Sequence, residues 1–180
     1  MNGVSGGLGP VRPAPSSGVR PVLPEAGQRS VWDFPRPPAV ESAQRLVEIV
    51  LAGGLICRTT DVVLVLETSH PPTWYLPVRS FTPGVLRPTD LTSVCEFKGV
   101  AEYFDLVAGR VMAARSGWGY PEPLPGYEAL AGRVAVYASV MDEVLVDGVP
   151  VTPQPGGFYG GWITPDVVGP FKGEPGSEGW

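Results

Sequence analysis

The sequence predicts a mainly β domain built from short strands joined by tight turns. Glycine and proline make up 24 and 22 of the 180 residues, a content that favours turns over long helices. Apolar residues amount to 43% of the chain, enough for a hydrophobic core. Short apolar or alternating runs recur between Gly, Pro and Asp-Gly pairs. These patterns indicate about eight to ten strands and almost no helix, arranged as a compact barrel or as small packed antiparallel sheets.

The composition divides the chain into three parts. Residues 1–28 contain Gly, Pro and Ser with little to bury, so we expect a disordered tail. Residues 29–152 contain the strand patterns and are expected to form one β domain. Residues 153–180 are rich in Gly and aromatic residues without periodicity. We expect them to form an arm that lies on the domain or on a second subunit of a homodimer.

The ordered part is predicted to begin with a proline-rich strap and a hairpin. Prolines favour extended backbone over residues 30–38, which would place Trp32 and Phe34 on the same side. Residues 45–58 are typical of a hairpin whose turn is Ala52-Gly53-Gly54, because apolar residues alternate on either side of that turn.

The rest of the domain continues with strands and tight turns. Val62–Leu66 is apolar throughout, which predicts a strand that is covered on both faces. The further expected elements are an extended segment over Trp74–Val78, a strand pair over Thr92–Leu106 that turns near Lys98-Gly99, a strand over Val111–Tyr120, one helical turn over Tyr127–Ala131, and strands over Val134–Tyr137 and Glu143–Val146, the last followed by an Asp147-Gly148 turn.

Charge and composition exclude several classes of protein. A net charge of −5 and the absence of basic runs argue against nucleic acid as a partner. No apolar stretch of about 18 residues is present to span a membrane, and we see no apolar signal region, so we expect a cytoplasmic bacterial protein. Cys57 and Cys95 have neither the number nor the spacing of a disulfide framework or a zinc site, so we expect no metal and no cofactor.

The candidate site centres on the polar turn Glu67-Thr-Ser-His70. His70 is the chain's only histidine. It can act as a general base or proton donor oriented by Glu67, or it can be a loop histidine that bonds backbone groups. Lys98, beside Gly99, can bind an anion, become a nucleophile, or be a solvated turn lysine.

The remaining candidates are one cysteine and a set of aromatic residues. Cys95 is a nucleophile or, since it alternates with Phe97, a core residue whose side chain faces away from Lys98. The aromatic residues can line one pocket with their polar tips available, or anchor the core. They are Tyr75, Tyr103, Trp118 and Tyr120.

Several of these segments together resemble one family. They are Val31-Trp-Asp-Phe-Pro-Arg-Pro-Pro38, Glu67-Thr-Ser-His-Pro-Pro-Thr-Trp-Tyr-Leu-Pro77, Cys95-Glu-Phe-Lys-Gly-Val-Ala-Glu-Tyr103, Trp118-Gly-Tyr-Pro121, Gly126-Tyr-Glu-Ala-Leu130 and Val144-Leu-Val-Asp-Gly148. The family is the bacterial domain of unknown function 427, sometimes labelled nucleotidyltransferase-like. The resemblance implies a β-tent, an arrangement of small antiparallel sheets shared with some zinc-binding and methionine-sulfoxide-reducing domains.

The chemistry of those relatives does not carry over to this sequence. The relatives bind zinc through paired Cys-x-x-Cys motifs, and this chain has none. Nucleotide transfer would need a Gly-rich phosphate loop before a helix, or a close carboxylate pair for Mg²⁺, and neither motif is found.

Three functions remain open from the sequence. The first, which we favour, is a module that binds a small polar or anionic molecule in an aromatic cleft. The second is a hydrolase or group transferase in which His70, held by Glu67, moves a proton and Lys98 stabilises negative charge. The third is a protein-interaction domain that acts through the arm.

Overall fold

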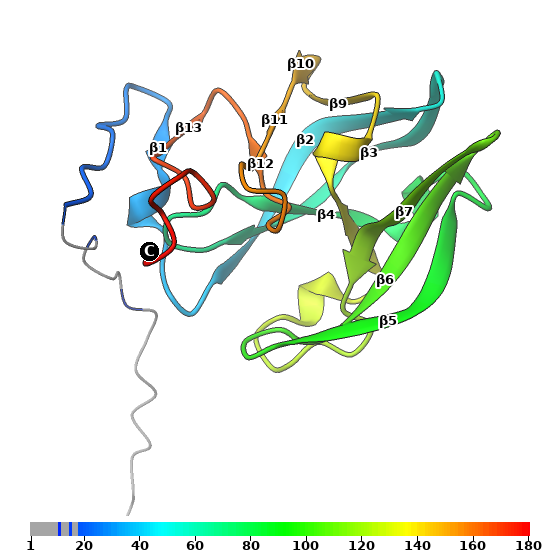
Figure 1. The fold of residues 1–180 in the computed structure, drawn as a ribbon, viewed down its shortest axis with the longest axis horizontal. Helices are drawn as coiled ribbons and strands as arrows, with labels where there is room; N and C mark the ends of the chain where they lie inside the picture. The colour runs from blue at the N-terminus through cyan, green and yellow to red at the C-terminus, as the bar shows by residue number, and fades with distance from the viewer. Residues whose placement is uncertain (1–10, 12–14, 16–17) are drawn as a thin grey trace, which may run out of the picture.

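The computed structural model of the chain describes residues 11, 15 and 18–180. Its centre is one antiparallel sheet with β10 at one edge and β5 at the other, so the sheet is open and not a barrel (Figure 1). In spatial order the strands are β10 (Val149–Pro150), β9 (Glu143–Val146), β2 (Ala39–Leu51), β3 (Gly54–Leu66), β4 (Thr73–Pro77), β8 (Arg133–Val136), β7 (Val111–Gly119), β6 (Gly99–Ala108) and β5 (Leu86–Cys95). The prediction of a mainly β, antiparallel fold is confirmed.

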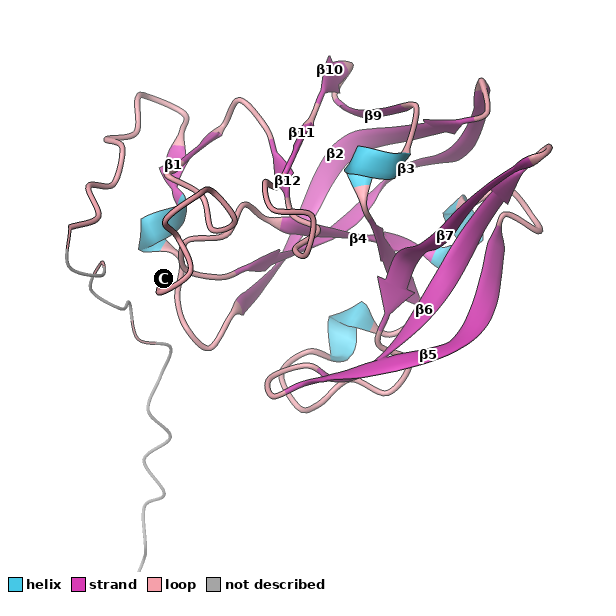
Figure 2. Ribbon diagram, in the orientation of Figure 1, coloured by secondary structure: helices cyan, strands magenta, loops and turns pink. Residues whose placement is uncertain are grey.

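Smaller elements complete the described chain. Two short sheets pair β1 (Arg29–Ser30) with β13 (Val167–Val168) and β11 (Thr152–Pro153) with β12 (Trp162–Ile163). Every helix is a single 3₁₀ turn (Figure 2); they are η1 (Val31–Asp33), η2 (Val78–Ser80), η3 (Glu128–Leu130) and η4 (Ala138–Val140). Among the described residues, no helix has the length and apolar character needed to cross a membrane.

The predicted hairpin is present and longer than expected. Strands β2 and β3 pair antiparallel along most of their length, and the turn between them places Ala52 at φ 54° and Gly53 at φ 72°. The sequence suggests separate strands on either side of residues 59–61, but β3 runs through them without a break. This polar stretch stays extended because it pairs with β2, Thr59 with Val47 and Asp61 with Gln44.

Strands β3 and β4 lie between two hydrophobic cores, as predicted for the apolar run Val62–Leu66. Val62 and Trp74 are in the first core, which also includes residues of β2, β8 and β9. Val63 and Tyr75 are in the second core, together with aromatic residues near the end of β7. Because successive side chains of a strand point to opposite faces, a strand between two cores is apolar at every position.

The tight turns of the second half follow the sequence. Strands β5 and β6 pair antiparallel from Cys95 and Gly99 onward, around a turn over residues 96–98. Strands β9 and β10 are joined by Asp147 and Gly148 at φ 51° and 79°, the left-handed pair that a two-residue hairpin turn requires.

The strap differs from the sequence prediction. Residues 31–33 form the 3₁₀ turn η1 instead of an extended segment, because the Ser30 hydroxyl accepts a hydrogen bond from the Trp32 backbone N–H at 3.3 Å. The prolines follow this turn and therefore do not prevent it. Trp32 and Phe34 are both buried, in a third cluster with Val31 and Val167.

The N-terminal tail and the C-terminal arm that the sequence predicts both contact the folded domain where the structure describes them. Of the proposed tail, residues 1–10, 12–14 and 16–17 lie outside the described residues, whereas Val22 donates its N–H to Gly169 O at 2.9 Å. The arm lies on its own domain beside β1 (Figure 1). Its Trp162 is buried, stacks on Trp74 at 5.7 Å and donates from Nε1 to Val136 O at 2.9 Å.

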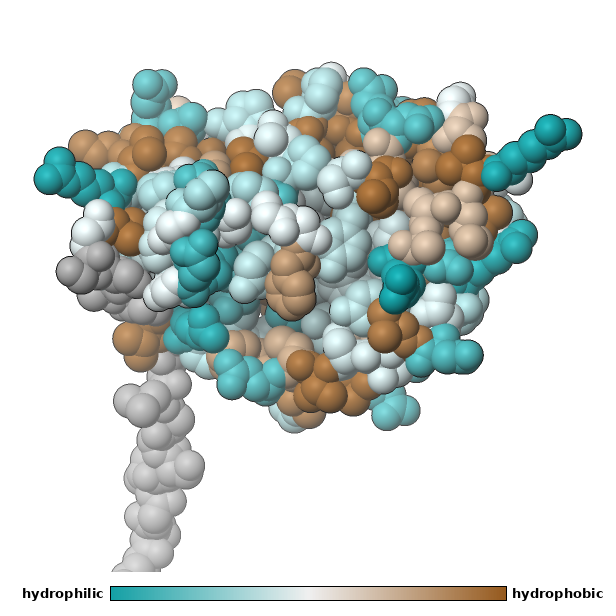
Figure 3. Space-filling model, in the orientation of Figure 1, coloured by the Kyte–Doolittle hydropathy of each residue, from teal (hydrophilic) through white to brown (hydrophobic). Residues whose placement is uncertain are grey.

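The surface on the side of the arm is mixed. Figure 3 shows apolar side chains in several separate groups on this face, between polar ones. Phe158 of the arm is among the most exposed apolar residues, with 75% of its surface accessible.

The contact between β7 and β8 leaves no space for a side chain at Gly119. A Cβ atom there would lie 2.5 Å from Arg133 O, a backbone atom that cannot move without disturbing the sheet. We therefore expect Gly119→Ala to lower the free energy of unfolding by about 1–3 kcal/mol, the usual cost of overpacking. The control Gly54→Ala, whose Cβ would lie 3.7 Å from Leu51 O, should change it little. Urea denaturation of the two variants tests this; equal effects would contradict it.

Candidate functional site

A cavity of about 430 Å³ lies on the side of the second core, between the β3–β4 turn, the β5–β6 turn and the arm. All the side chains that the sequence predicts for the site line this cavity. They are Glu67, His70, Tyr75, Cys95, Lys98, Tyr103, Trp118 and Tyr120. The structure therefore brings together residues from four strands and two turns, while their functional roles stay predictions.

The polar turn before β4 is held by the strap on one side and by the arm on the other. Thr68 Oγ1 donates to Phe34 O at 2.5 Å, and Ser69 N–H donates to Val31 O at 3.1 Å. Ser69 has φ 68°, an uncommon conformation for a residue with a side chain, and its carbonyl accepts from Lys172 N–H at 2.8 Å. Strap and arm thus hold the turn in a conformation that it would not favour alone.

The ring of His70 is held by a backbone carbonyl. Its Nδ1 lies 3.0 Å from Thr68 O, and a carbonyl only accepts, so Nδ1 carries the proton and the neutral ring has an unprotonated Nε2. Burial lowers the pKa of His70 below its ordinary 6.5; Lys172 and Lys98 lower it further, whereas Glu67 and the Thr68 carbonyl oppose the shift. His70 is therefore neutral at pH 7.

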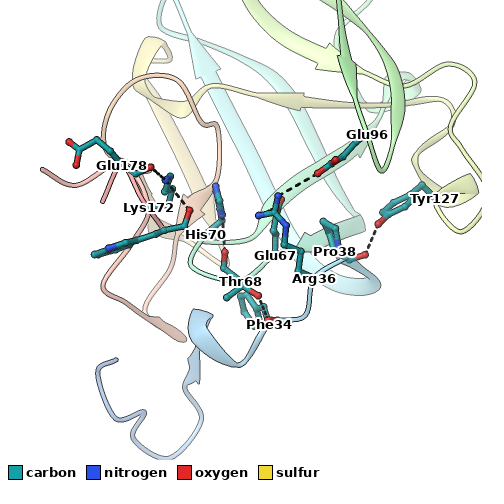
Figure 4. A network of polar contacts seen from close by, with 11 residues as sticks. Phe34, Arg36, Pro38, Glu67, Thr68, His70, Glu96, Tyr127, Lys172 and Glu178 are labelled. Atoms are coloured by element: carbon teal, nitrogen blue, oxygen red, sulfur yellow. Dashed lines mark hydrogen bonds and ion pairs between the residues drawn. The ribbon is translucent and has the colours of Figure 1, made fainter. Parts of the chain in front are cut away.

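Glu67 does not take the orienting role that the sequence suggests. The His70 ring forms its hydrogen bond with Thr68 O, and the Glu67 carboxylate pairs with Arg36 at 3.4 Å. Arg36 also pairs with Glu96 at 3.5 Å, so this arginine links the strap to the β5–β6 turn. Figure 4 shows His70 between Lys172 on one side and the Glu67–Arg36 pair on the other.

Lys98 and Cys95 face the same cavity, contrary to the prediction that they point to opposite faces. Residues 96–98 form a turn, so the strand alternation ends at Cys95 and no longer sets the direction of Lys98. Lys98 Nζ lies 5.9 Å from the centre of the Tyr120 ring. Gly99 has φ 102°, a conformation that permits this turn and that favours glycine.

Aromatic rings form much of the wall. Trp118 contacts Tyr137 at 4.6 Å between ring centres and Tyr75 edge-on at 6.5 Å. Burial raises the pKa of Tyr75 and of Tyr120 above the ordinary value of 10, because a buried phenolate loses its hydration. These rings therefore belong to the core and also line the cavity. The hydroxyl groups of Tyr75 and Tyr120 stay protonated.

The cavity also contains residues that the sequence did not identify. Most come from the arm and the strap. They are Arg36, Val65, Thr73, Ser93, Tyr137, Gln154, Phe158, Tyr159, Gly160, Lys172 and Trp180. Tyr159 contacts the His70 ring edge-on at 4.7 Å. One sequence signal existed: Lys98 and Lys172 are the only two lysines of the chain, and both line this cavity.

Lys172 is buried and its charge is met by backbone oxygens. Its Nζ donates to Ser177 O at 2.7 Å, to Glu178 O at 2.9 Å and to Trp180 O at 3.1 Å. Gln154 Nε2 donates to the Lys172 carbonyl at 2.9 Å. These bonds fold residues 173–180 back over the site. Each of the three N–H donors of the Lys172 ammonium group thus has an acceptor.

The cavity is cationic in an acidic protein. Its charged lining residues are Arg36, Lys98 and Lys172 against the carboxylate of Glu67. One positive charge remains in excess after Glu96, the second partner of Arg36, is counted, whereas the whole chain has a net charge of −5. Within residues 11, 15 and 18–180, no three His, Cys, Asp or Glu side chains lie together as metal ligands would. Cys57 lies elsewhere, in the first core, where burial raises its pKa to about 11.

The lowered pKa of His70 predicts a pH dependence of stability. The unfolded chain binds a proton near pH 6.5, whereas the folded protein binds it only at lower pH, so protonation favours unfolding. The His70 contribution should be constant above about pH 6.5 and should be lost as the pH falls from there through the folded-state pKa. Comparing the urea stability of the wild type and His70→Gln at pH 7.5 and 5.0 isolates it.

The ring can also be titrated directly by NMR, since the chain has one histidine. A midpoint at or above 6.5 for the His70 ring protons would contradict the assignment.

One family matches most of the folded domain. The family described as a domain of unknown function (DUF427), with the short name NTP_transf_9, matches residues 39–147. No curated protein matches the chain. The matched region contains His70 and Lys98, while Arg36 and Lys172 lie outside it. The resemblance seen in the sequence is confirmed, and the chain belongs to the DUF427 family.

Proposed function

We propose that the protein binds a small anionic molecule in the cavity around His70 and Lys98. The observation that carries this proposal is the excess of positive charge in a cavity of about 430 Å³ within a chain of net charge −5. Pockets of about 300–1,000 Å³ with aromatic walls and a few convergent polar groups are typical of small-molecule sites.

Lys98 is the cation best placed to meet the anion. Arg36 already pairs with Glu67 and Glu96, and Lys172 donates to backbone oxygens. Lys98 forms no ion pair with any residue in the described part of the chain, and its Nζ lies over the Tyr120 ring. An ammonium group with three donors and this little engagement supports binding of a carboxylate or phosphate.

The aromatic walls would select a ligand with a flat or apolar part. Trp118 and Tyr137 present ring surfaces to the cavity, and rings of this kind pack against planar groups. The neutral His70 and the protonated tyrosines offer hydrogen bonds without adding negative charge.

A thermal-shift screen of small carboxylates and phosphates, each beside its neutral amide or ester, tests the proposal. Anionic members should raise the melting temperature, because a ligand that binds only the folded state stabilises it. Lys98→Gln should weaken their binding about tenfold or more by calorimetry, since hydrogen bonds to charged groups contribute about 1.5–3 kcal/mol. Arg110→Gln removes a charge from the exposed β6–β7 turn and serves as the matched control. Equal binding of the charged ligands and their neutral analogues would contradict the proposal.

A second candidate is acid–base catalysis at the same site, favoured by one observation. The bond from Nδ1 to Thr68 O leaves Nε2 as a base, and Lys98 lines the same cavity and can stabilise negative charge. We expect any hydrolysis of p-nitrophenyl esters or phosphates by the wild type to be lost in His70→Gln while the affinity for a non-reactive anion is kept. Loss of both together would favour the binding function alone.

A further inference from the structure

A second cavity of about 320 Å³ adjoins the first. The two cavities share Tyr103 and Tyr137, so these two rings form the ridge between them. The other lining residues of the second cavity are Leu91, Ala114, Arg115, Ser116, Ser139, Val140 and Gly157. Phe158 and Tyr159 line the first cavity while Gly157 lines the second, so the arm passes along both.

Two bulges, one on each strand that pairs with β6, supply lining residues to the second cavity. On β5, Pro88 pairs with Phe104 and Thr92 with Glu102, so residues 89–91 stand opposite Tyr103 alone. On β7, the partners of Phe104 and Leu106 are Gly117 and Ala113, so residues 114–116 stand opposite Asp105 alone. Bulges re-aim side chains and are common next to binding and active sites. Here each bulge supplies lining residues to the same cavity.

Each bulge is held by its own polar contacts. Thr89 Oγ1 donates to Tyr103 O at 3.1 Å and accepts from Leu91 N–H at 3.2 Å. The carboxylate of Asp105 accepts from Arg115 N–H at 2.7 Å. Arg115 has φ 49°, a conformation that is unfavourable for an arginine and that persists where the surroundings enforce it.

Arg115 supplies a positive charge to the second cavity. Its side chain is exposed and forms no ion pair with the residues that the structure describes. The hydroxyl groups of the ridge already have partners that line the first cavity, because Tyr137 donates to Phe158 O at 3.1 Å and Tyr103 lies 3.0 Å from Ser93 Oγ. Between Lys98 and Arg115, the path over the ridge therefore presents mainly ring surface.

We infer that the ligand is an elongated molecule with an anionic group at each end and an apolar or planar middle. One anionic group binds at Lys98 in the first cavity, the middle crosses the rings of Tyr103 and Tyr137, and the second anionic group binds Arg115. This inference rests on the proposed function, since it extends the same site, and it adds the class of ligand and a specificity residue.

The test uses straight-chain α,ω-dicarboxylic acids of increasing length, each beside its monomethyl ester, titrated calorimetrically into the full chain. At the length that spans the ridge, the diacid should bind at least about tenfold more tightly than the half-ester. Arg115→Gln should remove that advantage and leave half-ester binding unchanged. Lys98→Gln should weaken both ligands, and the control Arg110→Gln should weaken neither.

Two outcomes separate this inference from the proposed function. A diacid advantage that survives in Arg115→Gln, or no advantage at any length, overturns the two-ended ligand while anion binding at Lys98 stands. Absence of Lys98-dependent binding by both ligands overturns the two together. Arg115→Asn, a residue that tolerates positive φ, repeats the test with the bulge conformation preserved.

Discussion

The fold depends on the burial of β3 and β4 from both sides. Val62 and Trp74 pack into one core while their neighbours Val63 and Tyr75 pack into the other. The two strands therefore separate and connect the two cores. The site is a result of this arrangement. The second core is rich in aromatic residues and is not filled at its edge, and the cavity opens there, where the β3–β4 turn must leave the sheet.

Polar contacts from the ends of the described chain complete the site. The strap bonds Thr68 and Ser69, and the arm bonds Ser69 from the other side through the backbone N–H of Lys172. Gly160 packs so closely against the Trp118 ring that any side chain at this position would collide with it. Close packing over the cavity thus requires glycine at this position of the arm.

Much of this could be predicted from the sequence, because strand alternation and turn residues act locally. The hairpin at Ala52-Gly53 and the turn at Asp147-Gly148 follow from such signals. The direction of Lys98 could not be predicted, because it depends on where the strand ends at Cys95. Arg36 and the arm residues were missed for a different reason: they reach the site through contacts between distant segments, and apart from the rarity of lysine, such contacts leave no pattern in a single sequence.

The long-range closure of the strap on the arm has a kinetic consequence. Trp32 Nε1 donates to Pro170 O at 2.9 Å, across 138 residues of sequence. Contacts of such separation form slowly, since the entropy of closing the loop is lost before the contact stabilises it. We expect the sheet to assemble before the strap and arm meet, and the cavity to be completed only in that last step. During synthesis, a chain that has not yet emerged as far as residue 170 would have its sheet but an incomplete site.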